Sequence, residues 1–519
     1  MKRDDMLREM ESHPGTWDFI VIGGGATGLG VAIEASSRGY ATLLVEQSDF
    51  AKGTSSRSTK LVHGGVRYLR QGNLSLVLEA LKERGLLYQN APHLVRNLPF
   101  VVPTYDWWEG PFYGVGLKLY DTMAGRQGFG HSRRLTREET QAMIPTIEME
   151  GLRGGIVYHD GQFDDARLAV HMAWTAAELG AVPLNYMRVT GLRKSNGTVR
   201  GVTAVDAESG KAYEIEGRVV VNATGPFSDA VRRMDDPQCP RMIRPSQGVH
   251  VVLKRSFLPG SSAVMVPHTA DGRVLFAIPW HDRVVVGTTD TMVEEASLEP
   301  TPLPEEVDFI LEHAARYLTR DPSKADVLSA YAGVRPLVSL DGDQGTASIA
   351  RDHTISISRS GLVTIAGGKW TTYRRMAEDT VDHAVVLAEL PEKPSVSRRL
   401  RIHGYHPLAD ELGSLSVYGT DAAAIGELIA ENPKLGETIH PEMPALRAEV
   451  VWAARNEMAR TVEDVLARRT RSLLLDAKAS IEMAPEVAEL LAKELRKDQS
   501  WRNRQVEEYA ALAQRYLPR

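Results

Sequence analysis

The N-terminal part of the chain places two apolar runs on either side of a segment with helical spacing. Residues 18–22 and 41–45 are short apolar runs of the kind that form parallel strands covered on both faces. Residues 26–38 have the spacing of a helix, and Gly39 stands just past its end, where a left-handed residue commonly stops a helix. The pattern therefore predicts a strand–helix–strand unit.

The pattern that follows divides into three blocks. Residues 74–180 have mainly helical spacing, interrupted by an aromatic stretch over 107–120. Residues 186–222 predict short strands around a turn at 208–210, and residues 244–358 predict several more strands with one helix near 305–318. A buried strand at 362–366 then leads into a helix over about 372–387. Mixed strands and helices of this kind predict an α/β fold.

The C-terminal part has a different pattern. Pro391 and Pro394, flanked by polar residues, predict a linker, and the chain after it reads as almost wholly helical. One apolar face is predicted to run along a single helix, and its residues are Val451, Ala454, Met458, Val462 and Val465. We therefore expect residues 398–519 to form a separate all-helical cap.

Composition narrows the classes of protein that fit. Charged residues make up 25% of the 519 residues with a formal net charge of -6, and no long basic run predicts a nucleic-acid partner. The single cysteine, Cys239, excludes an intrachain disulfide and a cysteine-built metal site, so no metal is expected. The charged first residues do not look like a signal peptide, and no apolar run approaches the roughly 20 residues of a membrane span. These features predict a cytoplasmic protein that could lie on the inner face of the cell membrane without crossing it.

A glycine motif follows the first predicted strand. Gly23, Gly25 and Gly28 fit the G-x-G-x-x-G spacing of a turn in which backbone N–H groups and a helix N-terminus meet a pyrophosphate. Glu46 ends the second predicted strand, where a carboxylate accepts hydrogen bonds from ribose hydroxyls. The register of these elements predicts a dinucleotide site, and the alternative is a tight turn in an unrelated α/β fold.

Two later segments favour FAD over NAD. Residues 218–225 and 362–368 each predict a strand that ends in small residues, among them Ala223, Gly225, Gly367 and Gly368. Segments so far apart in the chain would grip a long cofactor, and no second glycine fingerprint for NAD is present. Taken singly, each segment also fits an ordinary turn.

At these motifs the chain resembles the FAD-dependent glycerol-3-phosphate dehydrogenase family, within the larger class that includes D-amino-acid oxidase. The resemblance is carried by residues 23–28, 53–69, 222–229, 332–336, 367–373 and a helical segment with Asp464 and Arg468. It implies a doubly wound, Rossmann-like FAD-binding domain, a mixed-sheet substrate domain and the helical cap. We expect residues 16–395 to form the oxidoreductase part, with FAD-binding portions at about 16–90, 150–240 and 350–390 and substrate-domain portions at about 91–149 and 241–349.

The resemblance also implies an activity, which is oxidation of glycerol 3-phosphate to dihydroxyacetone phosphate with a quinone as electron acceptor. A homodimer is the expected assembly. Three alternatives stay open: an oxidase that reduces oxygen to peroxide, an amino-acid oxidase, and a binding protein in which FAD is structural.

A small phosphorylated substrate needs cations, and the resemblance supplies candidates for them. Arg67, Tyr68 and Arg351 are expected to bind the substrate, and Arg335 and Lys369 are expected to stand beside the flavin and take part in the reaction. His250 is the first candidate for the base that takes the hydroxyl proton. His63 is the second, with cofactor contact as its alternative role.

A hydroxyl-rich loop precedes these residues. By resemblance it runs under the flavin and supplies donors to it, and Thr371 is expected to join it at the cofactor. The loop candidates are Ser55, Ser56, Ser58, Thr59 and Lys60.

The aromatic stretch at 107–120 begins with Trp107 and Trp108. Tryptophan and tyrosine suit a membrane interface because each combines an apolar body with a polar tip. Core packing and a subunit contact explain the same composition, so membrane contact is one of three hypotheses.

Overall fold

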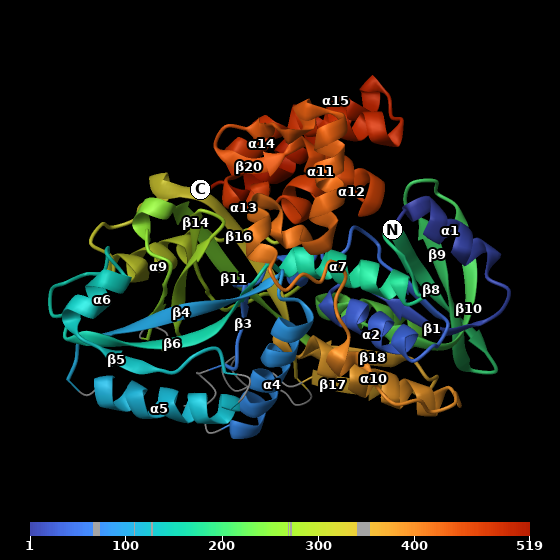
Figure 1. Ribbon diagram of the computed structural model, residues 1–519. Helices are drawn as coiled ribbons and strands as arrows, with labels where there is room; N and C mark the ends of the chain where they lie inside the picture. Colours follow the sequence, from blue (N-terminus) through green and yellow to red (C-terminus); the bar gives the residue numbers. More distant parts are fainter. Residues whose placement is uncertain are drawn as a thin grey trace.

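A computed structural model of the protein describes residues 1–65, 73–107, 109–125, 128–267, 269, 272–339 and 353–518. Two large sheets stand side by side, and the C-terminal cap covers both at one end (Figure 1). The α/β class with a mixed second sheet and a mainly helical C-terminal part is confirmed.

The first sheet carries the doubly wound half. Its main path pairs five parallel strands, β7-β2-β1-β10-β18, with β17 antiparallel at the edge. The predicted strands at 18–22, 41–45, 218–222 and 362–366 all lie on this path. The strands are β1 (Trp17–Ile22), β2 (Thr42–Val45), β7 (Val182–Leu184), β8 (Met187–Ser195), β9 (Thr198–Asp206), β10 (Ala212–Asn222), β17 (His353–Ile357) and β18 (Val363–Gly367).

Helices cover both faces of this sheet. α2 packs between α7 and α10 on one face, while the β8–β9–β10 meander and α1 lie at the other side (Figure 1). The helices of this half are α1 (Arg3–Ser12), α2 (Ala26–Ser37), α4 (Leu74–Asn90), α7 (Asp165–Glu178), α8 (Ser228–Asp235) and α10 (Tyr373–Leu387).

The second sheet is mixed, because β12 and β4 pair in parallel while its other strand pairs run antiparallel. Its strands are β3 (Leu61–Val62), β4 (Val95–Thr104), β5 (Arg133–Leu135), β6 (Gly154–Phe163), β11 (Ile243–Lys254), β12 (Ala263–Val266), β13 (Leu275–Trp280), β14 (Arg283–Gly287), β15 (Thr291–Met292) and β16 (Val327–Val338). The helices around it are α5 (Glu109–Ala124), α6 (Arg137–Met143) and α9 (Pro304–Ala315). β3 and β6 belong to this sheet, although both fall inside ranges that we assign to FAD binding, and the domain boundaries stay a proposal.

The mainly helical prediction for 74–180 was wrong in part. β4 and β6 are long strands, and they pair with each other over ten residues each. Pro99 and Pro103 argue against a strand in β4, because proline cannot donate to a ladder. The aromatic stretch, conversely, is mostly helical as α5, and Trp108 lies outside the described residues.

The cap is helical apart from one hairpin. Its helices are α11 (Ala422–Glu431), α12 (Arg447–Asn456), α13 (Ser472–Leu475), α14 (Ala477–Leu495) and α15 (Gln499–Ala513), and its strands are β19 (Thr438–His440) and β20 (Met443–Leu446). The hairpin corrects the all-helical expectation. The single helix through Val451 and Val465 was also wrong, because α12 ends at Asn456, Met458 has a φ of 55°, and a π-helical turn follows at Asp464–Arg469.

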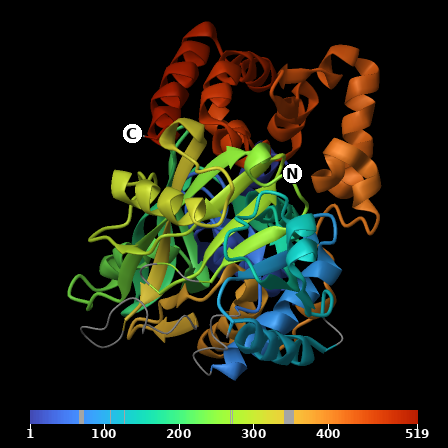
Figure 2. The same ribbon diagram turned by 90° about the vertical axis from the view of Figure 1, so that its left-hand side faces the viewer.

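The cap is packed tightly onto the rest of the molecule. Its apolar core is continuous with Val252, Trp280, Val285 and Tyr331 of the second sheet. Figure 2 shows the cap covering one end of both sheets, with α4 and α5 at the far end of the molecule. The cap therefore shares its core with the substrate half.

Candidate active site

The turn between β1 and α2 leaves no room for side chains. A Cβ on Gly28 would lie 1.9 Å from the carbonyl oxygen of Gly23, and a Cβ on Gly23 would lie 2.7 Å from the carbonyl oxygen of Ala223. Gly23 also has a φ of 112°, a conformation that glycine adopts freely. Gly25 is the N-cap of α2 and offers no capping side chain, so the positive helix end faces the neighbouring cavity.

A cavity of about 300 Å³ lies in front of this turn. Segments that are distant in the chain line it: the glycine turn, the loop after β2, the turn after β10 and the turn after β18. The site candidates among the lining residues are Gly23, Gly25, Glu46, Ser55, Ala223, Gly225, Gly367, Gly368 and Lys369. A cavity that combines glycine turns with apolar and polar side chains fits the phosphates and rings of a dinucleotide.

Glu46 stands at the end of β2, where the sequence places it. One carboxylate oxygen accepts the N–H of Gly24 at 2.7 Å and the other accepts the N–H of Ser48 at 2.9 Å. Burial raises the pKa of Glu46 above its ordinary value. Since each oxygen has a second lone-pair direction, the carboxylate keeps capacity for ribose hydroxyls.

The side chains of the hydroxyl-rich loop point in two directions, some toward the cavity and some into the protein. Ser55 lines the cavity, and its Oγ accepts the N–H of Ala26 at 2.9 Å. Ser58 and Lys60 instead point into the protein: the Ser58 Oγ and the Lys60 Nζ bond the same carboxylate oxygen of Asp165, at 2.7 and 2.6 Å. Burial lowers the pKa of Lys60 to about 8.

Five further cofactor candidates lie outside the cavity wall described here. Ser56 is buried, and its Oγ donates to the carbonyl of Gly53 at 3.4 Å. The N–H of His63 donates to Thr371 Oγ1 at 3.3 Å. This bond connects the residues just after β3 with the segment 367–371. The residues of this group are Gly28, Ser56, Thr59, His63 and Thr371.

The second sheet brings His250 beside this loop. Its Nε2 lies 2.9 Å from Thr59 Oγ1, and its ring stacks on Tyr331 with centroids 4.8 Å apart. The buried Nδ1 has no hydrogen-bond partner among the described residues. Burial, with the positive charges of Lys60 and Arg335, holds the pKa of His250 well below its ordinary value, so the ring is neutral near pH 7.

Arg335 comes from β16, four residues from the partner of His250 in the β11–β16 ladder. Its guanidinium pairs with Asp290 at 3.2 Å and donates to Thr288 Oγ1 at 3.2 Å. Asp290, with a side chain only 2% exposed, also pairs with Arg273 at 3.4 Å. Pro336, next in the chain, lines the cavity, so Arg335 stands at the border between cavity and sheet.

Three of the predicted substrate residues lie outside the described residues, namely Arg67, Tyr68 and Arg351. The structure adds cavity residues that we did not predict, including Met187, Arg188 and Val189 of β8. The short strand β7 could have indicated them. It pairs with β2 in parallel, so the residues that follow β7 lie next to Glu46, which follows β2. Asp165, the anchor of Ser58 and Lys60, carried no recognisable sequence signal.

The chain matches two family profiles. Residues 18–374 match "FAD dependent oxidoreductase", and residues 363–502 match "C-terminal domain of alpha-glycerophosphate oxidase".

Individual proteins match over nearly the whole chain. The mitochondrial glycerol-3-phosphate dehydrogenase of Macaca fascicularis is 41% identical, and the alignment covers 96% of this chain and 73% of that protein. The mitochondrial glycerol-3-phosphate dehydrogenase SDP6 of Arabidopsis thaliana is 42% identical over 93% of this chain and 84% of its own length. The crystal structure of the glycerol-3-phosphate dehydrogenase from Bacillus halodurans complexed with FAD superposes with a TM-score of 0.81 at 31% identity, covering 99% of this chain and 97% of that one.

Proposed function

Because the chain belongs to the FAD-dependent glycerol-3-phosphate dehydrogenase family, we propose that it oxidises glycerol 3-phosphate to dihydroxyacetone phosphate. One observation carries the proposal beyond the family: a neutral, buried imidazole and a guanidinium stand on paired strands, and the guanidinium belongs to the residue next to Pro336 of the cavity wall. Together they match the two needs of the reaction, a proton acceptor and a cation for a dianion.

FAD, when bound, supplies the acceptor for the hydride that leaves carbon 2 of the substrate. In this proposal Nδ1 of His250 takes the proton of the carbon-2 hydroxyl, so that hydride and proton leave together as two electrons and two protons are removed overall. Thr59 holds the opposite ring nitrogen at 2.9 Å and thereby fixes the ring. The bound dianion favours the protonated ring and so raises the pKa of His250 toward a useful range.

Arg335 and Lys369 are proposed to bind and orient the substrate from two sides. Arg335 is held by Asp290 on the second sheet, and Lys369 lines the cavity from the turn after β18. A guanidinium in a fixed fork suits a phosphate, and an ammonium suits a developing alkoxide. Arg67, Tyr68 and Arg351 stay predicted members of the same pocket.

The test is anaerobic mixing of the purified holoprotein with glycerol 3-phosphate. We expect the visible flavin absorption to bleach, and we expect glycerol, which lacks the phosphate, to leave it unchanged at the same concentration. A colourless protein that does not take up FAD would contradict the cofactor assignment. A yellow protein that bleaches with a D-amino acid or glycine instead would contradict the substrate assignment.

We further propose a quinone as the electron acceptor. Support comes from the matched relatives, which are named dehydrogenases. A solved oxidase from Mycoplasma pneumoniae is only 17% identical and supports the shared fold alone. Recovery of colour by a soluble quinone under anaerobic conditions is the expected result, whereas rapid recovery by oxygen with stoichiometric peroxide would select the oxidase alternative. The homodimer stays a prediction that sedimentation would check.

Contact with a membrane is proposed for the end of the molecule formed by α4 and α5. Among the described residues, no helix is both long enough and apolar enough to cross a bilayer. Apolar side chains nevertheless stand exposed on these adjacent helices and before α5: Leu74 (47%), Leu78 (49%), Trp107 (76%) and Leu119 (46%). Large apolar side chains on one side of a protein suit the interfacial region of a bilayer.

The triple variant L78S/W107A/L119S is expected to lose binding to phospholipid vesicles while its flavin still bleaches with substrate. Leu408→Ser, which changes an exposed leucine on the cap, serves as the control. Equal vesicle binding by the triple variant and the control would end the membrane proposal.

A further inference from the structure

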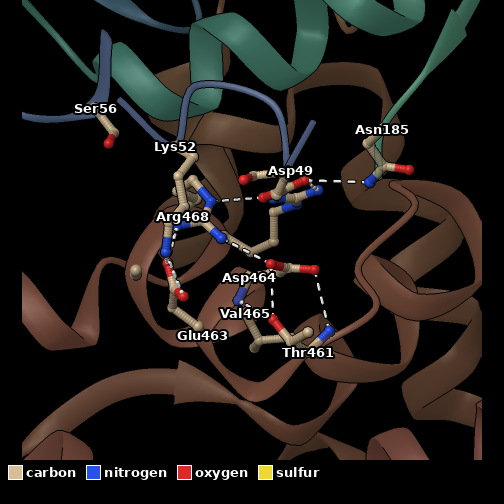
Figure 3. A network of polar contacts seen from close by, with 12 residues as sticks. Asp49, Lys52, Ser56, Asn185, Thr461, Glu463, Asp464, Val465 and Arg468 are labelled. Carbon is tan, nitrogen blue, oxygen red and sulfur yellow. Dashed lines mark hydrogen bonds and ion pairs between the residues drawn. The ribbon is translucent and has the colours of Figure 1, made fainter. Parts of the chain in front are cut away.

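One short stretch of the cap reaches into the cofactor half. Residues 463–471 contain Arg468, Arg469 and Arg471, whose side chains are at most 2% exposed. All three pair with carboxylates that lie outside the cap, and Figure 3 shows the part of the network around Arg468. Buried guanidiniums are costly unless they are paired, so these contacts determine how the stretch packs.

The first contact is at the start of the loop that follows β2. Asp49 accepts a hydrogen bond from Arg468 Nε at 2.6 Å (Figure 3), and it accepts another from Arg469 Nη2 at 3.0 Å. Burial pushes the pKa of Asp49 upward, yet the two guanidiniums hold it below its ordinary value. Asp49 is therefore a buried carboxylate whose charge is neutralised by two guanidiniums of the cap.

A second contact is made by Lys52, which follows Asp49 in the same loop. Lys52 donates to both carboxylate oxygens of Glu463 at 2.6 Å, and it also pairs with Glu299 at 2.8 Å. Arg57 pairs with Glu299 at 2.7 Å and donates to the hydroxyl of Tyr516 near the C-terminus at 3.1 Å. The middle of the loop is thus tied to the cap as well.

The third contact is at the end of the loop. Asp165 bonds Lys60 through one carboxylate oxygen and Arg471 through the other, at 2.6 and 2.5 Å. The same Asp165 oxygen that bonds Lys60 also accepts the N–H of Ser58 at 3.1 Å. Arg471 reaches Asp164 too, with its Nε 3.2 Å from Oδ1.

The loop between these contacts forms the cavity wall. Residues 51–55 line the cavity, and the regular structure described in the loop 49–60 is a 3-10 turn at Thr54–Ser56. Ala51 and Lys60 have φ values of 60° and 63°, which are costly for residues with a Cβ. A strained loop of this kind keeps its shape only where its surroundings hold it, and here the cap holds both ends.

We propose that the cap positions the cofactor: the stretch 463–471 holds the loop 49–60 in the shape that lines the FAD cavity, with Arg471 as a positioning residue that acts through Asp165. This inference rests on the FAD part of the proposed function and is independent of the substrate.

The test compares FAD affinity in three variants of the full chain. Arg471→Gln removes the charge, Arg471→Lys keeps the charge but loses the fork, and Arg460→Ala is the control. Arg460 also forms a cap-to-core pair, bonding Glu208 at 2.5 and 2.7 Å, but this pair is partly exposed and Glu208 lies in the turn between β9 and β10. FAD is titrated into apoprotein and followed by the quenching of flavin fluorescence.

Arg471→Gln is expected to raise the Kd for FAD by about tenfold or more, as removal of one partner from a buried charge pair predicts. Arg471→Lys is expected to give a smaller rise, and Arg460→Ala to match the wild type. Equal Kd values for Arg471→Gln and Arg460→Ala overturn the proposal. If Arg471→Gln does not fold, Arg471→Lys decides, and an unchanged Kd in that variant overturns it. A wild type that binds no FAD would defeat the proposed function instead.

The pH dependence of FAD binding separates positioning from a purely structural role. The titratable groups that face Lys60 are Asp165 of α7 and its N-cap Asp164, Arg471 of the cap, His250 of β11 and Tyr331 of β16. The pKa of Lys60 is lowered to about 8, because burial and the charge of Arg471 lower it more than Asp165 raises it. Loss of that charge in Arg471→Gln should move the alkaline midpoint of FAD affinity to higher pH. A midpoint equal to that of Arg460→Ala overturns the positioning role of Arg471 through Asp165, the carboxylate that also holds Lys60.

Discussion

The turn after β1 and the end of β16 build the two sides of the site by different means. On the cofactor side the wall is backbone: Gly28 and Gly23 bring carbonyls and N–H groups so close that a single methyl group would collide with them. On the substrate side stand two side chains, His250 and Arg335, which bond Thr59 and Asp290, while burial and the positive charges of Lys60 and Arg335 keep His250 neutral. A backbone wall is sensitive to added volume, whereas a side-chain wall is sensitive to lost charge.

The largest effect is expected for Gly28→Ala. Its Cβ would meet a backbone carbonyl at 1.9 Å, so the turn must move, and we expect a protein without FAD whose free energy of unfolding falls by about 2 kcal/mol or more. Gly426→Ala is the matched control, because Gly426 also lies inside a helix but has nothing within 4 Å. That control should gain about 0.5–1 kcal/mol. Flavin content and thermal melting measure both, and a yellow Gly28→Ala protein would contradict the backbone side of the comparison.

Arg335→Leu should separate the two sides. The variant is expected to keep FAD, since Arg335 is not part of the cavity wall, but to lose about 100-fold or more in kcat/KM for glycerol 3-phosphate. Arg335→Lys keeps the positive charge but loses the two-pronged guanidinium, so its kcat/KM should fall between those of the wild type and Arg335→Leu. Anaerobic bleaching rates and flavin content give both readouts. Loss of FAD in the leucine variant would show that the two sides are not independent.

The smallest effect concerns His250 and acid stability. Its folded pKa is held well below 6.5 by burial, so below about pH 6.5 the unfolded chain binds a proton that the folded chain does not. The stability contributed by this group is present above that pH and is lost on acidification, by up to about 2 kcal/mol between pH 7 and 5. His250→Asn should therefore lose less melting temperature than the wild type over this range. Equal losses would mean that the ring protonates freely in the folded protein.

Local sequence was enough to predict the cofactor side. The glycines are needed where a Cβ would collide with the backbone of the turn, so they stand close in sequence to the strand and helix that the turn connects. The motif at 23–28 and Glu46 therefore belong to one strand–helix–strand unit. The strands β10 and β18 were also predictable, because a parallel strand buried on both faces is a continuous apolar run. Arg335 was expected from the resemblance and His250 from the need for a base, and their partners were not predicted.

What the sequence by itself determined is therefore the class of fold, the glycine turn and the burial of apolar positions. Val451, Met458, Val462 and Val465 are buried and Ala454 is partly buried, although no single helix contains them. Only the tertiary structure decided where buried charges go. Asp165 lies 306 residues from Arg471, and no repeating pattern in the nearby sequence predicts a pair between residues so far apart. Hydrophobic burial leaves a repeating pattern along the chain, while the pairing of buried charges depends on which distant surfaces meet.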